Sequence, residues 1–297
     1  MYIFDGTALA LEKEEQLAAD VATLLARGGI RPTIAAILFR EDIGSQLYTR
    51  LKREAAARVG INYVVREFSL TDPIETVTAA ISQLNSNQEI TGIIVQKPWR
   101  KVWLRSNEEG DYASWWHSIM FAVDPSKDVD GLHPETLAAI KAGTWEVRGL
   151  VLPATCQAVL FALDTARSIV GSSAEAGKTI IIGRSDLLGL PLFAVLHGKG
   201  LDVELIGVKE LQERSASGQF LRDASRIVSA TGQKHLVTGE MVSDGVVVVD
   251  VGEPQPDVDQ TSIATKASFL TPVPGGIGPL TVSFLLENAM ILSSKCN

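Results

Sequence analysis

Residues 33–39 read Thr-Ile-Ala-Ala-Ile-Leu-Phe, an apolar run long enough for a buried strand. The pattern of the following residues predicts a helix, a strand, a second helix and a third strand, at residues 45–59, 63–68, 73–84 and 91–96. Strands that alternate with helices over so short a stretch form a parallel sheet with right-handed crossovers. The fold class is therefore predicted to be α/β.

Composition bounds the kind of protein. The chain has 297 residues, enough for one large or two medium domains, and 46% are hydrophobic and 21% charged, so a packed globular protein is expected. The net charge of -8 argues against a protein that binds nucleic acid or an anionic membrane over a broad surface. The two cysteines, Cys156 and Cys296, cannot build a disulfide framework. Because no signal peptide or membrane span is evident, a cytoplasmic location is expected.

The first candidate site lies on the helix predicted at 45–59. Tyr48 and Lys52 are four residues apart and therefore share one helix face. A desolvated lysine shifts its pKa readily, which suits proton transfer near neutral pH. Gln96 and Lys97 follow the third predicted strand, at the sheet edge where ligands bind in such folds. A solvated surface pair of Tyr48 and Lys52 is the alternative.

Two segments follow that the sequence leaves open. Residues 98–121 are rich in tryptophan and predict a helical or loop insertion, which either packs against its domain or a subunit, or forms an aromatic lid over a flat substrate. Asp128 and Asp130 then lie among turn residues. They form a solvated turn, half of a metal site, or a carboxylate that binds the edge of an amino-heterocycle. No further ligand cluster completes a metal shell, so no metal is predicted.

The second half of the chain has the pattern of a dinucleotide-binding domain. Strands are predicted at 179–182 and 202–206, and two further strand-then-glycine units at 226–232 and 245–252. The first strand leads through Gly183, Arg184 and Ser185 into a helix, the arrangement of a phosphate-binding turn, although the Gly-x-Gly-x-x-Gly spacing is absent.

The end of the second of these strands is where a ribose-binding acid normally lies. There the sequence reads Gly207-Val208-Lys209, so no acid for a ribose hydroxyl pair is expected. Lys209 and Arg184 are instead candidates for binding an extra phosphate.

Residues 270–281 form a loop rich in proline and glycine. Proline fixes φ and glycine permits close backbone approach, so a rigid loop against a ligand or a second backbone is expected. A last helix is predicted from Pro279 to about Ser293, packing back on the first domain.

An ordered series of motifs resembles the bifunctional methylenetetrahydrofolate dehydrogenase/methenyltetrahydrofolate cyclohydrolase family. The matching stretches are Ser45-x-x-Tyr48-x-x-x-Lys52, Gly92-Ile-Ile-Val-Gln96-x-Pro98, Pro125-x-Lys-Asp-Val-Asp-Gly131 with His133-Pro134, Gly183-Arg-Ser185 with Gly189 and Pro191, Ala230-Thr-Gly232, Val249-Asp-Val-Gly252 and Thr271-Pro-Val-Pro-Gly-Gly-Ile-Gly-Pro279. They cover nearly the whole chain.

The resemblance implies two α/β domains with the active site in the cleft between them. Residues 1–147 with 279–297 would form the folate-binding catalytic domain, and residues 148–278 a Rossmann-like domain that binds NADP, with NAD as an alternative. It also implies a homodimer. The implied reactions are oxidation of 5,10-methylenetetrahydrofolate with NADP and hydrolysis of the product to 10-formyltetrahydrofolate.

The resemblance also implies roles for individual residues. Lys52 would activate water or manage the proton, Tyr48 and Gln96 would orient it, and Asp130 would hold the pterin ring. The candidate substrate-binding residues are Tyr48, Lys52, Val95, Gln96, Lys97, Asp130, Pro274, Gly275, Gly276, Ile277 and Gly278. The candidate cofactor-binding residues are Thr155, Gly183, Arg184, Ser185, Lys209, Gly252 and Glu253.

Several positions depart from the family pattern. Lys97 and Trp99 stand where the family usually has leucine, and Gly207-Val208 replaces a His-Ser pair that normally contacts the 2′-phosphate. Glu253 stands where an apolar residue usually touches the cofactor. Two alternatives therefore stay open: a cyclohydrolase with a weakened or NAD-preferring nucleotide site, and a binding protein that keeps the fold.

Overall fold

The computed structural model describes residues 1–107, 110–171 and 177–295, so Cys296 lies outside the described residues. The chain divides into two compact units, and each is named here for its sheet. The small-sheet unit comprises Leu11–Ala139, Thr144–Ala154 and Val282–Asn297. The large-sheet unit comprises Met1–Ala10, Ile140–Gly143 and Thr155–Thr281.

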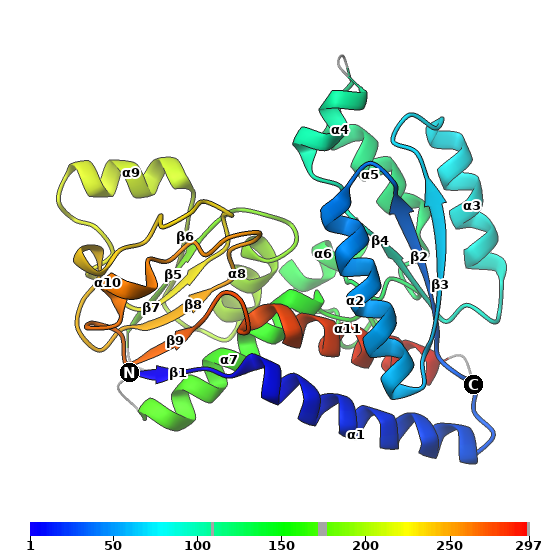
Figure 1. Ribbon diagram of the computed structural model, residues 1–297, viewed down its shortest axis with the longest axis horizontal. Helices are drawn as coiled ribbons and strands as arrows, with labels where there is room; N and C mark the ends of the chain where they lie inside the picture. Colours follow the sequence, from blue (N-terminus) through cyan, green and yellow to red (C-terminus); the bar gives the residue numbers. More distant parts are fainter. Residues whose placement is uncertain (108–109, 172–176, 296–297) are drawn as a thin grey trace. The chain divides into compact units, whose positions relative to one another are not determined.

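The small-sheet unit contains the predicted parallel sheet. Its strands lie in the order β3 (Asn62–Phe68), β2 (Thr33–Phe39) and β4 (Gly92–Val95), all parallel (Figure 1). Every residue of the central strand β2 is buried, as its apolar run predicts. The helices that follow β2, β3 and β4 are α2 (Ile43–Val59), α3 (Ile74–Ser86), α4 (Arg100–Ser106), α5 (Tyr112–Ala122) and α6 (Pro134–Lys141).

Local sequence fixes both ends of α2. The Asp42 carboxylate accepts hydrogen bonds from the N–H groups of Gly44 and Ser45 at 3.1 and 3.3 Å, which satisfies two donors that the helix leaves free. Gly60 ends the helix in the left-handed conformation, with φ of 79°. The predicted helix and its glycine stop are confirmed.

The last helix, α11 (Ile277–Ser293), belongs to the small-sheet unit from Val282 onward. Within that unit the Asn288 amide donates hydrogen bonds to the carbonyls of Val129 and Leu152, each at 3.0 Å. The predicted return of the C-terminal helix to the first half of the chain is therefore confirmed. The long N-terminal helix α1 (Gly6–Ala26) contributes residues to both units.

The large-sheet unit contains a parallel sheet of six strands, larger than the four strands predicted. Their order is β1 (Tyr2–Ile3), β9 (Phe269–Thr271), β8 (Val247–Asp250), β7 (Ala224–Ser229), β5 (Lys178–Ile182) and β6 (Val203–Ile206). The two strands missed, β1 and β9, are too short to show a pattern of their own. They pair with each other at one end of the sheet, where the rings of Tyr2 and Phe269 stack.

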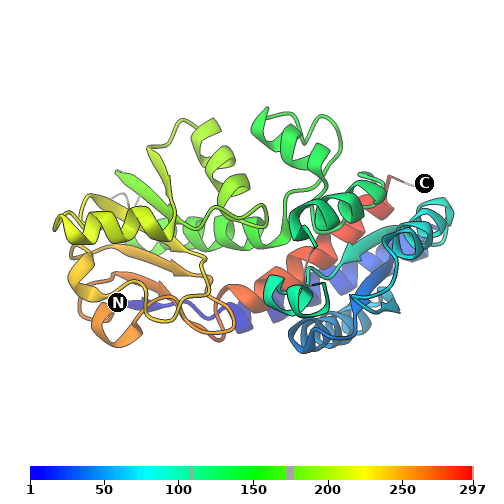
Figure 2. The same cartoon turned by 90° about the horizontal axis from the view of Figure 1, so that it is seen from above.

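Helices complete the large-sheet unit. Helix α8 (Gly189–Gly198) packs against β5 and β6 (Figures 1 and 2). The remaining elements are α7 (Ala154–Val170), α9 (Val208–Ala216), a short 3₁₀ helix (Gly239–Met241) and α10 (Gln260–Ile263). A buried cluster of aliphatic side chains from β5, β6, β7 and β8, including Ile180, Ile227 and Val248, forms the core of this unit.

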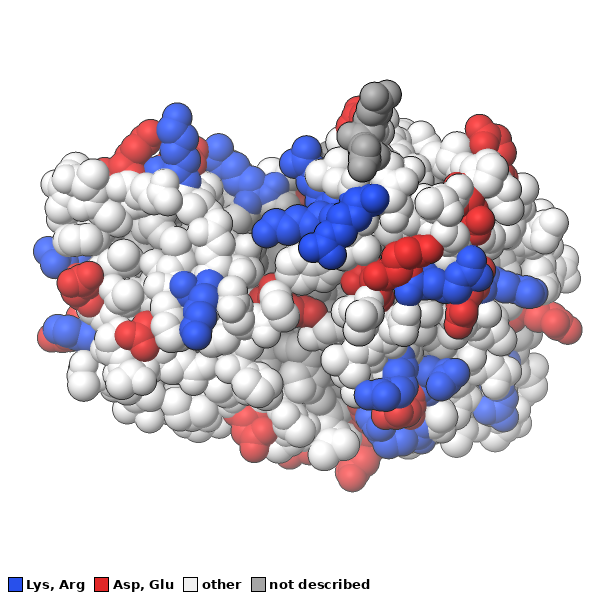
Figure 3. Space-filling view, turned by 45° about the horizontal axis from the view of Figure 1, so that its top comes forward, with Lys and Arg blue, Asp and Glu red and all other residues white. Residues whose placement is uncertain are grey.

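The surface carries both signs of charge. On the face shown in Figure 3, lysine and arginine are interspersed with aspartate and glutamate. Of the helices in the described part of the chain, none has the length and apolar character needed to cross a membrane.

Candidate functional site

Lys52 lies inside the small-sheet unit and not on its surface. The Nζ atom of Lys52 donates a hydrogen bond of 3.1 Å to Oε1 of Gln96. Only 9% of Lys52 and 5% of Gln96 is exposed. The helix that follows β2 and the residue that follows β4 thus meet, as their positions along the parallel sheet predict. The alternative of a solvated pair is therefore wrong for Lys52, while Tyr48, half-buried on the same helix, lies one turn before it.

Asp42 anchors the start of α2 to the segment after β4. Besides capping the helix, its Oδ2 atom accepts hydrogen bonds from the Ser45 hydroxyl at 3.0 Å and from the Trp99 N–H at 2.9 Å. Asp42 is buried, and charge-assisted bonds of this kind are strong. It therefore fixes the helix that carries Lys52 relative to the chain that carries Gln96. Aspartate is a preferred N-cap residue, so the position of Asp42 directly before the helix is the feature of the sequence that indicates its role.

Two further ionisable groups lie near the Lys52–Gln96 pair. Burial raises the pKa of the Asp130 carboxyl, and the positive charge of Lys52 acts in the opposite direction. Burial also raises the pKa of the Tyr63 phenol; the charge of Asp130 raises it further, and the neighbouring Gln96 side chain lowers it. Asp130 and Tyr63 thus share one environment with Lys52. No spacing rule in the sequence pointed to Tyr63.

Asp128 has a structural position that differs from that of Asp130. Its two carboxylate oxygens accept hydrogen bonds from the N–H groups of Gly131 at 3.1 Å and His133 at 2.6 Å. Burial raises the pKa of Asp128 to about 7. Asp128 therefore shapes the turn that presents Asp130. The described residues contain no group of three or more His, Cys, Asp and Glu side chains arranged to hold a metal ion.

The tryptophan-rich insertion folds as α4 and α5, and α5 packs against both α3 and α4. Trp103 and Trp116 are buried, and the Trp115 ring contacts Phe39 of the central strand at 5.2 Å between centroids. Trp99 is the exception, with 44% of its surface exposed. Lys97 lies over the Trp116 ring, 4.9 Å from its centroid, so the charge next to Gln96 is held by an aromatic face.

The carboxyl ends of the large sheet bring together the glycine turns found in the sequence. Gly183, directly after β5, has φ of 119°, and a Cβ atom there would lie 2.5 Å from the Ala230 carbonyl oxygen after β7. A Cβ atom on Gly189, at the start of α8, would lie 1.8 Å from the Gly183 oxygen. Between them the Ser185 hydroxyl accepts a hydrogen bond from the Leu188 N–H at 3.3 Å. Strand, tight turn and helix start therefore have the geometry of a phosphate-binding turn.

The neighbouring turns close on each other in the same way. A Cβ atom on Gly232 would lie 2.7 Å from the Glu253 carbonyl oxygen, and Gly252 leaves no room for a side chain beside Asp257. Asp257 accepts hydrogen bonds from the Ser229 and Thr231 hydroxyls at 2.7 and 2.9 Å. Buried hydrogen bonds thus tie the ends of β7 and β8 together, with the Glu253 side chain exposed.

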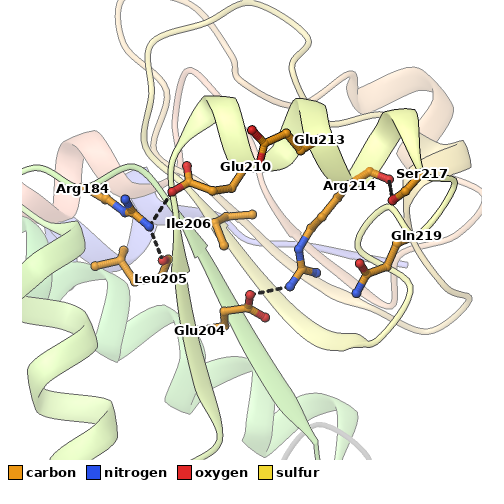
Figure 4. A pocket seen from close by; sticks show the side chains of 9 residues that line it. All are labelled: Arg184, Glu204, Leu205, Ile206, Glu210, Glu213, Arg214, Ser217 and Gln219. Carbon is orange, nitrogen blue, oxygen red and sulfur yellow. Dashed lines mark hydrogen bonds and ion pairs between the residues drawn. The ribbon is translucent and has the colours of Figure 1, made fainter.

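An acid in the next helix reaches back to the end of β6. Glu210, in the first turn of α9, folds back so that its Oε2 atom accepts the Gly207 N–H at 3.0 Å. Its other oxygen lies 2.7 Å from Nη2 of Arg184 (Figure 4). The sequence does contain a signal for this acid, because glutamate three residues after an N-cap commonly bonds back to it.

Arg184 and Glu210 border a pocket of about 370 Å³ at β6 and α9, which Glu204, Glu213 and Arg214 also line (Figure 4). Lys209 is the other candidate for an extra phosphate. Its side chain is 86% exposed, and its Nζ atom lies 3.9 Å from Oε1 of Glu213. Thr155 lies at the start of α7 and is half-buried.

The proline- and glycine-rich loop follows β9 and is held by backbone. The Gly275 carbonyl accepts a hydrogen bond from the Thr7 N–H at 3.1 Å, and a Cβ atom on Gly6 would lie 1.8 Å from the Gly276 oxygen. The expected close approach of a second backbone is confirmed for Gly275 and Gly276. Gly278 has open space around it, and Pro274 follows a cis peptide bond.

Comparisons with known proteins match both halves of the chain. Residues 4–130 match the model of the tetrahydrofolate dehydrogenase/cyclohydrolase catalytic domain, and residues 153–297 match that of the NAD(P)-binding domain. The bifunctional protein FolD of Methanococcoides burtonii is 35% identical over 99% of this chain and 96% of its own length. The crystal structure of the bifunctional enzyme FolD from Campylobacter jejuni superposes with a TM-score of 0.84 at 30% identity, covering 99% of both chains. The Trypanosoma brucei enzyme, solved with NADP cofactor and an inhibitor, also has a TM-score of 0.84, at 28% identity over 99% of this chain and 97% of its own.

Proposed function

This chain belongs to the tetrahydrofolate dehydrogenase/cyclohydrolase family, and we propose that its residues carry out both reactions of that family. In the first, 5,10-methylenetetrahydrofolate is oxidised to the 5,10-methenyl cation with NADP. In the second, water converts that cation to 10-formyltetrahydrofolate. The bifunctional activity inferred from the resemblance agrees with the relatives found along the full length of the chain.

The observation that carries the proposal is the buried hydrogen bond between Lys52 and Gln96. The neutral amine of Lys52, the form that a cationic substrate favours, accepts the proton that water loses as its oxygen bonds to the methenyl carbon. The bond from that carbon to N5 of the folate then breaks: N5 takes up the proton held by Lys52, the new hydroxyl releases its proton to solvent, and the formyl group stays on N10. Gln96 accepts a hydrogen bond from the amine and so directs it, and Tyr48 on the same helix is proposed to orient water or substrate.

Asp130 is proposed to bind the folate ring. A half-buried carboxylate presents two acceptors, which match the paired N–H donors on the edge of an amino-pterin. Val95, Lys97 and the loop of Pro274, Gly275, Gly276, Ile277 and Gly278 are proposed as further substrate contacts.

The large-sheet unit fits a dinucleotide. Gly183 lets the backbone turn where any side chain would strike the Ala230 carbonyl, and the following helix directs N–H groups at a phosphate. When bound, NADP supplies the acceptor for the hydride that leaves the methylene carbon. Arg184, Ser185 and Lys209 are proposed to hold its phosphates, and Thr155, Gly252 and Glu253 to border it.

Domain division, assembly and location complete the proposal. We assign residues 1–147 with 279–297 to folate binding and residues 148–278 to nucleotide binding. The resemblance supports a homodimer, and the net charge of -8 disfavours nucleic acid as a partner. Cys156 is a buried free thiol, typical of proteins in the reducing cytoplasm.

The decisive test replaces Lys52 by alanine. The hydrolysis of methenyltetrahydrofolate, followed by the loss of its absorbance, should fall by about 10²-fold or more, because positioned proton transfer is worth about 10²–10⁴-fold. Arg50→Ala is the matched control on α2, since Arg50 is exposed and only approaches Glu54 at 3.9 Å. Hydrolysis at the parent rate by Lys52→Ala would refute the role given to this residue.

A second candidate function is a cyclohydrolase that prefers NAD. The Arg184–Glu210 ion pair favours it, because an acid at the end of this strand binds ribose hydroxyls in NAD-dependent Rossmann domains. Titration of each nucleotide by fluorescence separates the two: NADP binding that is clearly tighter than NAD binding excludes this candidate.

A further inference from the structure

Two buried polar atoms at the Lys52–Gln96 pair and its neighbour Tyr63 lack a hydrogen-bond partner among the described residues. They are the hydroxyl oxygen of Tyr63 and the Nε2 atom of Gln96. Almost all buried polar groups in proteins are paired, so an unpaired one requires an explanation, and functional sites are a common one. Here the two unpaired atoms belong to neighbouring side chains, and one of these side chains already accepts a hydrogen bond from Lys52.

The sheet register explains why Tyr63 reaches this place. Tyr63 on β3 pairs with Ile34 on β2, and Ile34 also pairs with Gly92 on β4. Because side chains alternate along a strand, Tyr63, Ala36 and Gln96 point to the same face. Ala36, on the central strand between β3 and β4, is small and fully buried.

The two atoms are chemically complementary. Gln96 Nε2 can only donate a hydrogen bond, and the Tyr63 oxygen can accept one. Their present contact falls short of hydrogen-bond geometry, although Gln96 is near enough to influence the Tyr63 phenol. A small rotation of either side chain would join them.

We propose that Tyr63 is a positioning residue that sets the orientation of the Gln96 amide toward Lys52. The two ends of an amide have nearly the same shape, and only the oxygen end can accept from the Lys52 amine. A phenol oxygen that receives Nε2 makes the orientation with Oε1 toward Lys52 the favoured one. Without the phenol oxygen, the amide can flip, which places the donor Nε2 of Gln96 against the donor Nζ of Lys52. The hydrogen bond that orients the Lys52 amine is then lost. This inference rests on the catalytic role proposed for Lys52.

A purely structural role predicts a different outcome. If Tyr63 only filled space, its buried hydroxyl would be unfavourable, and removing it would leave catalysis unchanged. Tyr63→Phe keeps the ring and removes only the oxygen. The variant therefore separates packing from positioning.

The experiment measures the hydrolysis of methenyltetrahydrofolate and thermal unfolding for the full chain. For Tyr63→Phe we expect kcat to fall about tenfold, since misplaced catalytic groups lose rate steeply. The KM should stay within about twofold, because ring binding by Asp130 is untouched, and the melting temperature should equal or exceed that of the parent. The control is Tyr112→Phe, which removes a tyrosine hydroxyl that donates to the Pro98 carbonyl at 2.6 Å in the same unit; its kcat should match the parent.

Each outcome is informative. An unchanged kcat in Tyr63→Phe overturns the inference, as does a loss that merely follows a lower melting temperature. If the phenylalanine variant does not fold, Tyr63→Leu, which lacks both the ring and the hydroxyl, is measured instead: a lower kcat at a parental melting temperature supports the inference, and a parental kcat overturns it. A parent protein that does not hydrolyse methenyltetrahydrofolate refutes the proposed function itself, and so distinguishes that failure from this one.

Discussion

The carboxylate of Glu210 holds the guanidinium of Arg184 at 2.7 Å, at the end of β6 where the phosphate-binding turn and α9 meet (Figure 4). Arg184 is one of the residues proposed to hold a phosphate of the nucleotide, and it is already paired with an acid. Under that proposal, a 2′-phosphate would compete with the negative charge of Glu210. The two side chains are partly exposed, so the ion pair contributes little to the free energy of unfolding. We expect it to influence the relative affinity for NADP and NAD.

The first prediction is that Glu210→Gln tightens NADP binding. Glutamine keeps an oxygen that can accept the Gly207 N–H, so the start of α9 is preserved while the charge is lost. The dissociation constant for NADP should fall about three- to tenfold, because a repelling charge near the phosphate is removed. NAD, which lacks the 2′-phosphate, should bind no more tightly. Fluorescence titration with both nucleotides measures the ratio.

The matched control is Glu213→Gln, one turn later on the same helix, where the carboxylate is largely exposed and approaches only Lys209. Its ratio of NADP to NAD affinity should equal that of the parent. An unchanged ratio in Glu210→Gln would show that this acid does not govern nucleotide choice.

The second prediction concerns pH. Burial raises the pKa of Asp128 to about 7, above its ordinary value of 3.8, so the folded chain binds a proton there that the unfolded chain releases. The resulting stability is fully present below pH 3.8 and is lost as pH rises through about 7. Asp250, whose pKa burial raises to about 6, acts with the same sign. The free energy of unfolding should therefore decline between about pH 4 and pH 7.

Urea denaturation at several pH values tests this. The contribution of one such carboxyl has a limiting slope of about 1.4 kcal/mol per pH unit. Asp128→Asn should lose part of the slope, whatever its absolute stability, because asparagine does not titrate. A slope equal to that of the parent would contradict the elevated pKa of Asp128.

The third prediction contrasts two glycines of the phosphate-turn region. Gly183→Ala should destabilise the protein by about 1–3 kcal/mol, since φ of 119° is unfavourable for alanine and its Cβ would strike the Ala230 carbonyl. It should also weaken NADP binding. Gly198→Ala, at the end of α8 with open space around it, should be neutral or stabilising by up to about 1 kcal/mol. Chemical denaturation of both variants provides the comparison; equal stabilities would refute the steric argument.

The features that could be predicted from the amino-acid sequence are those that depend on the local pattern of residues. The buried run of β2, the glycine stop of α2 and the alternation of strands and helices predicted a parallel α/β sheet, and the position of Gln96 after β4 predicted that it would lie near Lys52. These hold because strand burial, helix termination and the parallel order of strands are governed by nearby residues and by chain topology.

The groups that complete each site depend on the tertiary structure. Glu210 reaches Arg184 by folding back from a helix, and Tyr63 on β3 lies near Gln96, which follows β4 on the other side of the central strand. Strands β1 and β9 form because they pair with each other, and β9 also pairs with β8 of the large sheet. Such contacts join residues that are distant in the chain. Which hydrogen bonds and ion pairs form at these sites depends on side-chain packing in three dimensions. A pattern of neighbouring residues does not contain that information.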